Sequence, residues 1–206
     1  MTRGKFITLE GMDGAGKSTH LEWLPAFIEA RGVKVVQTRE PGGTPVGEKL
    51  REMLLDKSQG LHADTEALLM FAARREHIAK VIEPALRRGT WVLCDRFTDA
   101  TFAYQSAGSG LAWERIEALE RWVHGELQPD LTLYFDVSSE VGKARTSAVR
   151  EPDRFEREGR SFFDRVREGY LRRAREHPLR TCVINGAQRL EVVRQHVESI
   201  VLSHCF

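Results

Sequence analysis

The residues best suited to chemistry form one glycine-rich run near the start of the chain. It reads Gly-Met-Asp-Gly-Ala-Gly-Lys-Ser over residues 11–18 and fits the pattern G-x-x-x-x-G-K-[ST] at every fixed position. In such a loop, backbone N–H groups converge on a phosphate and the helix that follows adds partial positive charge. We expect Lys17 to reach the β- and γ-phosphate oxygens and Ser18 to ligate Mg²⁺. The run therefore predicts binding of a nucleoside triphosphate. The expected nucleotide contacts, called the P-loop below, are Gly11, Met12, Asp13, Gly14, Ala15, Gly16, Lys17, Ser18 and Thr19.

The segments beside the P-loop favour the same interpretation. Phe6–Glu10 is a short, apolar, partly β-branched run, which is typical of a buried strand. After the loop, apolar residues recur at helical spacing from Leu21 to Ile28, with Pro25 as the one residue unsuited to a helix. Strand, glycine loop and helix in this order form a phosphate-binding unit.

Composition excludes several classes of function. The 206 residues include 31 basic and 30 acidic side chains, so a net charge of +1 argues against non-specific binding to nucleic acid or to an anionic membrane. No apolar stretch approaches the roughly 18 residues that span a bilayer, and no signal peptide is recognised. The three widely spaced cysteines, Cys94, Cys182 and Cys205, are expected to be free thiols. We expect a cytoplasmic protein with a single domain over residues 1–206.

Short apolar runs alternate with amphipathic segments along the chain. Near-continuous apolar strands indicate burial on both faces, which predicts an α/β fold with a five-stranded parallel sheet and helices on both faces. The expected strands are Phe6–Glu10, Val33–Thr38, Trp91–Asp95, Leu131–Asp136 and Thr181–Ile184. The expected helices cover residues 18–31, 45–55, 64–88, 113–125, 140–148, 160–177 and 190–203.

Ligands of such a sheet bind beyond the carboxyl ends of its strands. The residues that follow the expected strands include the P-loop, residues 39–44, residues 95–97 and Asp136. Most of these segments pair a basic residue with a carboxylate, which suits polyphosphate together with Mg²⁺.

The third strand argues against the commonest P-loop proteins. A GTPase usually carries an N-K-x-D segment, and this sequence has none. A large ATPase usually ends an apolar strand with Asp-Glu, whereas this strand ends with Asp95 followed by Arg96. An arginine at that place indicates a second anionic substrate rather than a hydrolytic water.

At this point the sequence resembles the thymidylate kinases, which phosphorylate dTMP to dTDP with ATP. The resemblance runs in order to about Tyr170 and implies the fold of P-loop nucleoside monophosphate kinases, MgATP as donor and a homodimer. A kinase of another nucleoside monophosphate, or a P-loop regulator that binds ATP without catalysis, remain the alternatives. The matching segments are residues 11–19, 38–44, 69–74, 95–97, 103–105, 129–136 and 153–156.

The resemblance assigns catalytic roles to residues of the P-loop and of a lid. It places Asp13 beside the 3′-hydroxyl of the acceptor sugar and the metal shell. Some members of the family carry a catalytic arginine in the P-loop and others supply it from a lid. Because Gly14 and Ala15 leave this P-loop without arginine, a lid at about residues 146–160 becomes the expected source. Its candidates are Arg154 first and Arg150 second, alongside Lys17 and Arg96 as further catalytic residues.

Basic residues after the strands are expected at the acceptor phosphate. Arg96 should bind the phosphate of dTMP, and Asp95 should orient a water of Mg²⁺ or Arg96 itself. Arg39 and Glu40, with Pro41 after them, are expected beside the phosphate and the metal. Arg51 is either a further phosphate ligand, as the resemblance implies, or an ordinary surface arginine.

Base recognition is implied for the segment around residue 71. In the family a phenylalanine stacks on thymine, and an arginine four residues later donates to its O4. Arg74 matches that arginine, and Phe71 is the expected stacking residue, although ungapped alignment puts Met70 at its position. Phe71 and Arg74 are three residues apart and can share a helix face.

Three residues after the third strand are expected at the sugar and at the edge of the base. Thr101 and Gln105 are four residues apart in an expected helix and can read the polar edge of thymine. Tyr104 matches the family tyrosine that crowds the 2′ position and so favours deoxyribose.

Overall fold

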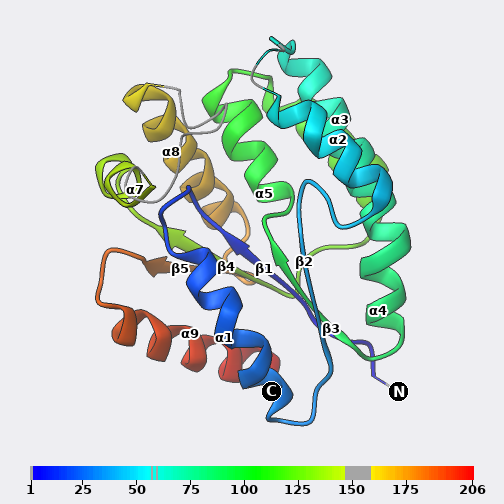
Figure 1. Cartoon of the computed structure of the whole chain (residues 1–206), viewed down its shortest axis with the longest axis vertical. Helices are drawn as coiled ribbons and strands as arrows, with labels where there is room; N and C mark the ends of the chain where they lie inside the picture. The colour runs from blue at the N-terminus through cyan, green and yellow to red at the C-terminus, as the bar shows by residue number, and fades with distance from the viewer. Residues whose placement is uncertain (1, 57, 59, 147–158) are drawn as a thin grey trace.

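The structure is a computed structural model that describes residues 2–56, 58, 60–146 and 159–206. Its centre is a five-stranded parallel sheet in the order β2-β3-β1-β4-β5 (Figure 1). The prediction of a five-stranded parallel α/β fold is therefore confirmed, with each strand boundary within two residues of its expected place. The strands are β1 (Phe6–Glu10), β2 (Val35–Arg39), β3 (Trp91–Asp95), β4 (Leu131–Asp136) and β5 (Thr181–Asn185).

Helices connect the strands and cover both faces of the sheet. In the described part of the chain, none of them is long and apolar enough to cross a membrane. The expected helix over residues 64–88 is present as one helical segment with a wider π-helical turn in its middle. The helices are α1 (Lys17–Glu29), α2 (Pro45–Leu55), α3 (Ala63–His77), η1 (Ile78–Ile82), α4 (Glu83–Arg87), α5 (Thr98–Thr101), η2 (Phe102–Gly108), α6 (Trp113–His124), α7 (Ser139–Thr146), α8 (Arg160–Glu176) and α9 (Leu190–Cys205).

The helix formed by α5 and η2 was not among the segments expected from periodicity, although it is the helix that was expected to hold Thr101 and Gln105. Nearly all of its residues from Thr98 to Ser106 are buried, including the polar ones. A helix that is buried on all sides shows no apolar stripe, so the 3.6-residue period that identifies surface helices is missing. The packing of η2 against α8 explains this burial.

Two hydrophobic clusters lie on opposite faces of the sheet. Along β3, Trp91 and Leu93 point into the cluster that includes α1 and α9, while Val92 and Cys94 point into the cluster that includes α3 and α6. This alternation buries both faces of the central strands. It explains why those strands are continuously apolar in the sequence.

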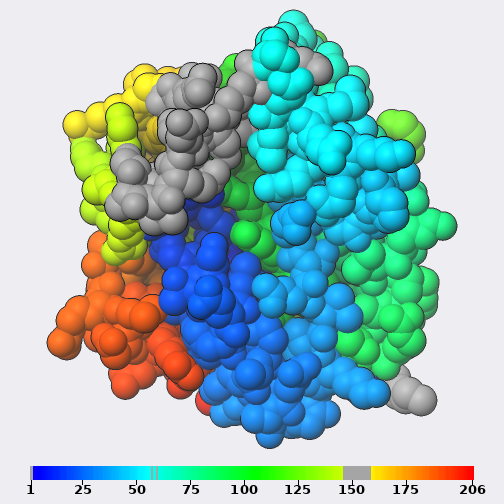
Figure 2. Space-filling model, viewed as in Figure 1, coloured from blue at the N-terminus to red at the C-terminus, as the bar shows by residue number. Residues whose placement is uncertain are grey.

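The sheet order brings three strand ends to one edge. β1 lies between β3 and β4, and Leu9 pairs with Asp95, which in turn pairs with Arg39 of β2. The Arg96 N–H donates to the Leu9 carbonyl oxygen at 3.0 Å. The P-loop, the segment after β2 and the segment after β3 therefore leave the sheet side by side. Figure 2 shows this face recessed between the P-loop region and α2, with the green segment that follows β3 visible inside.

Candidate active site

The glycines of the P-loop are required by close approach of neighbouring backbone. Gly11 has φ 139°, and a Cβ atom there would lie 2.6 Å from the Phe135 carbonyl oxygen of β4. At Gly14, with φ 79°, a Cβ atom would lie 2.3 Å from the Gly142 carbonyl oxygen of α7. The loop is thus wedged between β4 and α7. Because Gly16 stands at the N-cap of α1, no side chain at that position covers the first N–H groups of the helix, and these groups suit a phosphate.

Lys17 lies folded against the loop that precedes it. Its Nζ donates to the Gly11 carbonyl oxygen at 2.8 Å and to the Met12 carbonyl oxygen at 3.1 Å, and it lies 3.9 Å from Asp13 Oδ1. Burial lowers the pKa of the Lys17 ammonium, and the charge of Arg96 adds to that effect. Ser18 and Thr19 are exposed at the start of α1.

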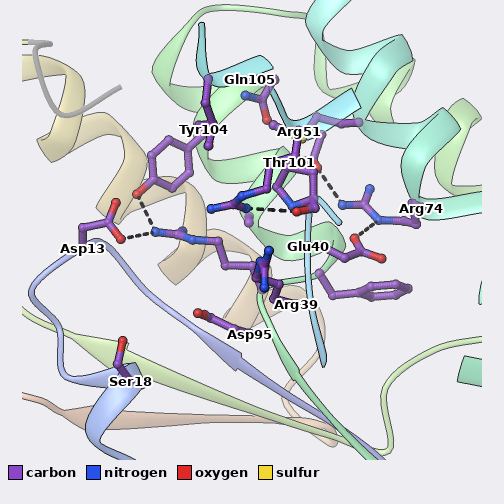
Figure 3. A pocket seen from close by; sticks show the side chains of 16 residues that line it. Asp13, Ser18, Arg39, Glu40, Arg51, Arg74, Asp95, Thr101, Tyr104 and Gln105 are labelled. Atoms are coloured by element: carbon purple, nitrogen blue, oxygen red, sulfur yellow. Dashed lines mark hydrogen bonds and ion pairs between the residues drawn. The ribbon is translucent and has the colours of Figure 1, made fainter. Parts of the chain in front are cut away.

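A cavity of about 320 Å³ opens beside the P-loop, a size at the lower end of small-molecule sites. It brings together residues that are distant in sequence, from the P-loop to η2. Figure 3 shows Asp13 and Ser18 at one end and Glu40 and Arg74 at the other. Twelve of the predicted site residues line it: Asp13, Ser18, Arg39, Glu40, Pro41, Arg51, Arg74, Asp95, Arg96, Thr101, Tyr104 and Gln105.

Arg96 crosses from the end of β3 to the P-loop. Its Nη2 donates to Asp13 Oδ1 at 3.0 Å and to the Tyr104 hydroxyl at 3.3 Å (Figure 3), and its Nη1 donates to the Tyr170 hydroxyl at 3.1 Å. Burial alone would lower the pKa of the guanidinium, but Tyr104, Asp13 and Tyr170 outweigh it and raise the pKa. The backbone of Arg96 is left-handed, with φ 66°, a conformation that costs a non-glycine residue roughly 1 to 3 kcal/mol.

A buried ionic network closes the far end of the cavity. Arg74 Nε donates to Glu40 Oε2 at 2.6 Å, and its Nη2 donates to the Thr101 hydroxyl at 3.1 Å. His77 bonds Glu40 Oε1 through Nδ1 at 2.9 Å and the Thr38 hydroxyl through Nε2 at 2.7 Å. Burial would raise the pKa of Glu40, but Arg74 and His77 hold it below its usual value. The network fixes the Arg74 guanidinium at the cavity wall.

Two more arginines and one carboxylate lie near the rim. Arg39 is exposed and pairs with Glu48 at 2.8 Å, and Arg51 donates to the Pro41 carbonyl oxygen at 3.0 Å. Burial lowers the pKa of Arg51, and Arg39 adds to the effect. Asp95 Oδ1 is buried and has no hydrogen-bond partner among the described residues. The rim thus combines two positively charged side chains with a carboxylate oxygen, Asp95 Oδ1, that can still accept a hydrogen bond or ligate a cation.

The expectation for Phe71 needs correction, because its side chain does not line the cavity. Phe71 is 2% exposed and belongs to the core cluster of α3 and α6, where its ring lies 6.1 Å from His124. Met70 lines the cavity instead, as the ungapped alignment allowed, together with Phe97. The reason is helix geometry: Met70 and Arg74 are four residues apart and share one face, whereas Phe71 is turned toward the sheet.

The remaining predicted residues are distributed as follows. Gln105 donates to Glu66 Oε1 at 2.6 Å at the cavity wall. Arg150 and Arg154, and the expected lid except its ends, lie outside the described residues. Of the P-loop, only Asp13 and Ser18 line the cavity, while Gly11, Met12, Gly14, Ala15, Gly16, Lys17 and Thr19 form the adjoining loop and the start of α1.

Two residues of this region were missed by sequence reasoning. Tyr170 comes from α8 and contacts Arg96, and Glu10 is the last residue of β1 and accepts from the Tyr170 hydroxyl at 3.1 Å. Glu10 carried one usable signal, since a carboxylate that ends an apolar strand directly before a P-loop stands at the ligand edge. Nothing local in the sequence distinguishes Tyr170 from an ordinary core tyrosine.

Comparison with known proteins gives one consistent result. A family model described as thymidylate kinase matches residues 9–197. The thymidylate kinase of Nitrosospira multiformis is 62% identical over 199 residues, and that of Methylobacillus flagellatus is 61% identical over 199 residues; each comparison covers 97% of both chains. The crystal structure of thymidylate kinase from Ehrlichia chaffeensis superimposes with a TM-score of 0.78 at 36% identity, covering 97% of this chain and 99% of that one.

Proposed function

The chain belongs to the thymidylate kinase family and phosphorylates dTMP to dTDP, and we propose that ATP, bound with Mg²⁺ at the P-loop, is the phosphoryl donor. The observation that carries the proposal is that one cavity joins P-loop side chains to the arginines at the ends of β2 and β3. Phosphoryl transfer needs two phosphates held in line and their mutual repulsion neutralised, and little covalent work from the protein. A cavity with the P-loop at one end and arginines along its wall supplies that arrangement.

On the acceptor side, we propose that Arg96 binds the phosphate of dTMP, with Arg39 and Arg51 adding charge from the rim. Arg96 is suited to this role because its guanidinium lies next to Asp13 of the P-loop. A guanidinium has five N–H donors, so contacts with three protein oxygens leave donors for a phosphate. We propose that Asp13 in turn lies beside the 3′-hydroxyl of the sugar.

The far end of the cavity fits a pyrimidine that carries an oxygen at position 4. Arg74 Nη1 is buried and has no hydrogen-bond partner among the described residues, although its other donors are fixed by Glu40 and Thr101. A fixed cationic donor can hydrogen-bond to an oxygen at position 4 of the base but not to an amino group there, which is itself a donor. We propose that Arg74 donates to O4 of thymine while Met70 and Phe97 contact the base. We propose that Thr101 and Gln105, which also line the cavity, contact its polar edge and that Tyr104 contacts the 2′ position of the sugar.

On the donor side, the P-loop fits a triphosphate with Mg²⁺. The donor set is an exposed serine hydroxyl and a carboxylate oxygen without a partner among the described residues, Ser18 and Asp95, which suits a hard cation that keeps most of its waters. When bound, Mg²⁺ neutralises charge on the phosphates. Lys17 stabilises charge on the transferred phosphoryl group, and we propose that Arg154, or Arg150, adds a second cation from the lid.

We also propose that the protein is a homodimer formed through α2, α3 and α6. α3 packs against both α2 and α6, and the three helices expose large apolar side chains to solvent: Val46, Met53, Leu68 and Trp122. Trp122 is 81% exposed, which is costly for an indole on a free surface. Sedimentation of the wild type should give the mass of two chains, and Trp122→Glu should shift the equilibrium toward one. A wild type that sediments as a monomer would contradict the proposal.

The donor assignment is tested by steady-state kinetics with purified protein. With dTMP as acceptor, we expect turnover with ATP, dependence on Mg²⁺, and ADP as the second product. With MgATP as donor, we expect dTMP to be preferred over dCMP, AMP and GMP. Preference for another monophosphate would favour the first alternative function, and ATP binding without phosphorylation of any acceptor would favour the regulator. Equal turnover with every nucleoside triphosphate would contradict the choice of ATP.

A further inference from the structure

We propose that Glu10 and Tyr170 are positioning residues that hold Arg96 by its backbone and by its side chain. Neither residue lines the cavity. Both are buried beneath it, and Tyr170 comes from α8, the helix that begins at Arg160 next to the expected lid. The inference rests on the proposal that Arg96 binds the acceptor phosphate.

Glu10 acts on the backbone of Arg96. Its Oε1 accepts from the Phe97 N–H at 2.7 Å, and the Arg96 N–H is held by the Leu9 carbonyl oxygen at 3.0 Å. The left-handed residue Arg96 therefore lies between two amide groups that β1 fixes. A strained backbone conformation persists only where the surrounding structure holds it in place, and these two hydrogen bonds hold Arg96 in its left-handed conformation.

Tyr170 acts on the tip of the Arg96 side chain. A tyrosine hydroxyl has one proton to donate, and here it donates to Glu10 Oε2 at 3.1 Å while accepting from Arg96 Nη1 at 3.1 Å. The ring is itself fixed, stacked on Tyr134 with ring centroids 4.9 Å apart and packed edge-on against Tyr104. Glu10, Tyr170 and Arg96 thus form a chain of hydrogen bonds, with the carboxylate at one end and the guanidinium at the other.

The electrostatics of this chain support a positioning role rather than a charge-neutralising one. Burial and Glu10 raise the pKa of Tyr170, so the phenol stays protonated and keeps its donor role. Burial raises the pKa of Glu10 to about 7, with Asp99 adding to the rise. Arg96 already has an anionic partner in Asp13, at 3.0 Å. Tyr170, as a neutral donor and acceptor, and Glu10, through the backbone, therefore select the direction of the guanidinium, and Tyr170 also helps to raise its pKa.

A double-mutant cycle on dTMP affinity tests the proposal. We expect Tyr170→Phe, which removes the hydroxyl but keeps the ring, to raise the Kd for dTMP about tenfold and to leave the KM for ATP within about twofold. In an Arg96→Ala background the same change should alter the Kd for dTMP by less than about twofold, because the group it positions is gone. Titration calorimetry measures these constants without requiring residual activity.

Tyr134→Phe is the matched control. It removes another buried hydroxyl from the same aromatic stack, but one that donates to Asp136 at 3.0 Å instead of contacting Arg96. It should leave the Kd for dTMP unchanged at a similar thermal stability. Should Tyr170→Phe fail to fold, Glu10→Gln takes its place in the cycle with the same expected coupling.

The outcomes separate the inference from its premise. An Arg96→Ala protein that binds dTMP as the wild type does would overturn the premise and the inference together. If Arg96→Ala weakens binding but Tyr170→Phe does not, or if the two effects simply add, the inference alone is overturned. Equal weakening by Tyr170→Phe and Tyr134→Phe would also overturn it, because a general loss of packing would then explain both.

Discussion

The P-loop and the cavity, which we propose bind the donor and the acceptor, hold their polar groups by different means. The P-loop relies on its backbone, because its glycines allow β4 and α7 to approach closely. Its one cation, Lys17, donates hydrogen bonds to carbonyl oxygens of the loop itself. The cavity relies on side chains, since Arg96 and Arg74 are each held by hydrogen bonds to several neighbours. In the loop a ligand must replace existing bonds of Lys17, whereas in the cavity the donors are already directed by the protein.

The difference implies different responses to mutation. In a loop with a single cation, one side chain supplies most of the charge that stabilises the phosphates. Changing that side chain should affect reaction with the donor and leave binding of the acceptor unchanged. In the cavity, several positioning residues together hold the arginines that we propose bind the acceptor. A single change there should therefore have a smaller effect, seen in the affinity for dTMP and in the selectivity among acceptors. The predictions that follow test this contrast.

The largest expected effect is that of Lys17→Ala. A preorganised cation stabilises the negative charge of the phosphoryl group in the transition state, so its removal should lower kcat about 10²- to 10³-fold. The variant has no second cation in the P-loop to compensate. The Kd for dTMP should stay within about twofold of the wild type, because Lys17 does not line the cavity. Steady-state kinetics and dTMP titration measure the two quantities.

Lys34→Ala is its control, since Lys34 is an exposed lysine just before β2, at the opposite end of that strand from the cavity. It should leave kcat unchanged. A Lys17→Ala protein that loses dTMP affinity as strongly as kcat would break the contrast between the two regions.

The same contrast explains what the sequence could predict. The P-loop and the strands were predictable because each is determined by consecutive residues: a fixed glycine pattern in one case and buried apolar runs in the other. Arg39, Asp95 and Arg96 were predictable as cavity residues because parallel strands end at a common edge. These signals needed only local sequence and the topology of the sheet.

What sequence reasoning missed depends on long-range packing. Thr101 and Gln105 were expected on a helix, but periodicity did not give its bounds, because α8 covers residues 98–108 and they show no apolar stripe. Phe71 and Met70 are adjacent, and only the docking of α3 on the sheet decides which one faces the cavity. Tyr170 reaches Arg96 from 74 residues away in the chain. No periodicity or spacing encodes such contacts, which arise when separate elements pack.

The second largest effect concerns stability, at the place where the two regions meet. Glu10 ends β1 directly before the P-loop and bonds the segment after β3. Its pKa is raised from 4.5 to about 7 in the folded protein, so the native state binds a proton that the unfolded state has released between these values. The free energy of unfolding should therefore fall as pH rises from about 4.5 to 7, by on the order of 3 kcal/mol from this residue.

Glu10→Gln removes this titration while keeping an oxygen for the Phe97 N–H. Urea unfolding at pH 5 and pH 8 should show that the advantage of the wild type over the variant is larger at pH 5. An equal difference at both pH values would show that Glu10 titrates normally. The groups that face Glu10 and stay in both proteins are Asp99 of α5, Arg96 and Cys94 at β3, Tyr170 of α8, Lys17 of α1 and Arg180 before β5.

The third effect is on selectivity at the far end of the cavity. Glu40→Gln replaces the carboxylate that holds Arg74 and His77 by a neutral amide, which has one acceptor oxygen and one N–H₂ donor in place of two acceptor oxygens. The preference for dTMP over dCMP, measured as a ratio of kcat/KM values, should fall about tenfold to a hundredfold. Glu198→Gln, on the surface of α9, should leave the ratio unchanged. Loss of activity with an intact ratio would mean that Glu40 supports the fold without directing Arg74.

The smallest effect is expected at Tyr104, whose ring lies 5.0 Å from the Arg96 guanidinium and packs against Phe162 and Tyr170. If the ring excludes a 2′-hydroxyl by occupying space, Tyr104→Ala should relax the preference for dTMP over its ribose counterpart about tenfold. Tyr104→Phe keeps the ring and should retain that preference, since the hydroxyl contact with Arg96 is long, at 3.3 Å. Competition between the two acceptors at limiting MgATP measures the ratio directly. Relaxation in Tyr104→Phe as well would transfer the discrimination from the shape of the ring to its hydrogen bond with Arg96, and unchanged discrimination in Tyr104→Ala would remove this tyrosine from sugar selection.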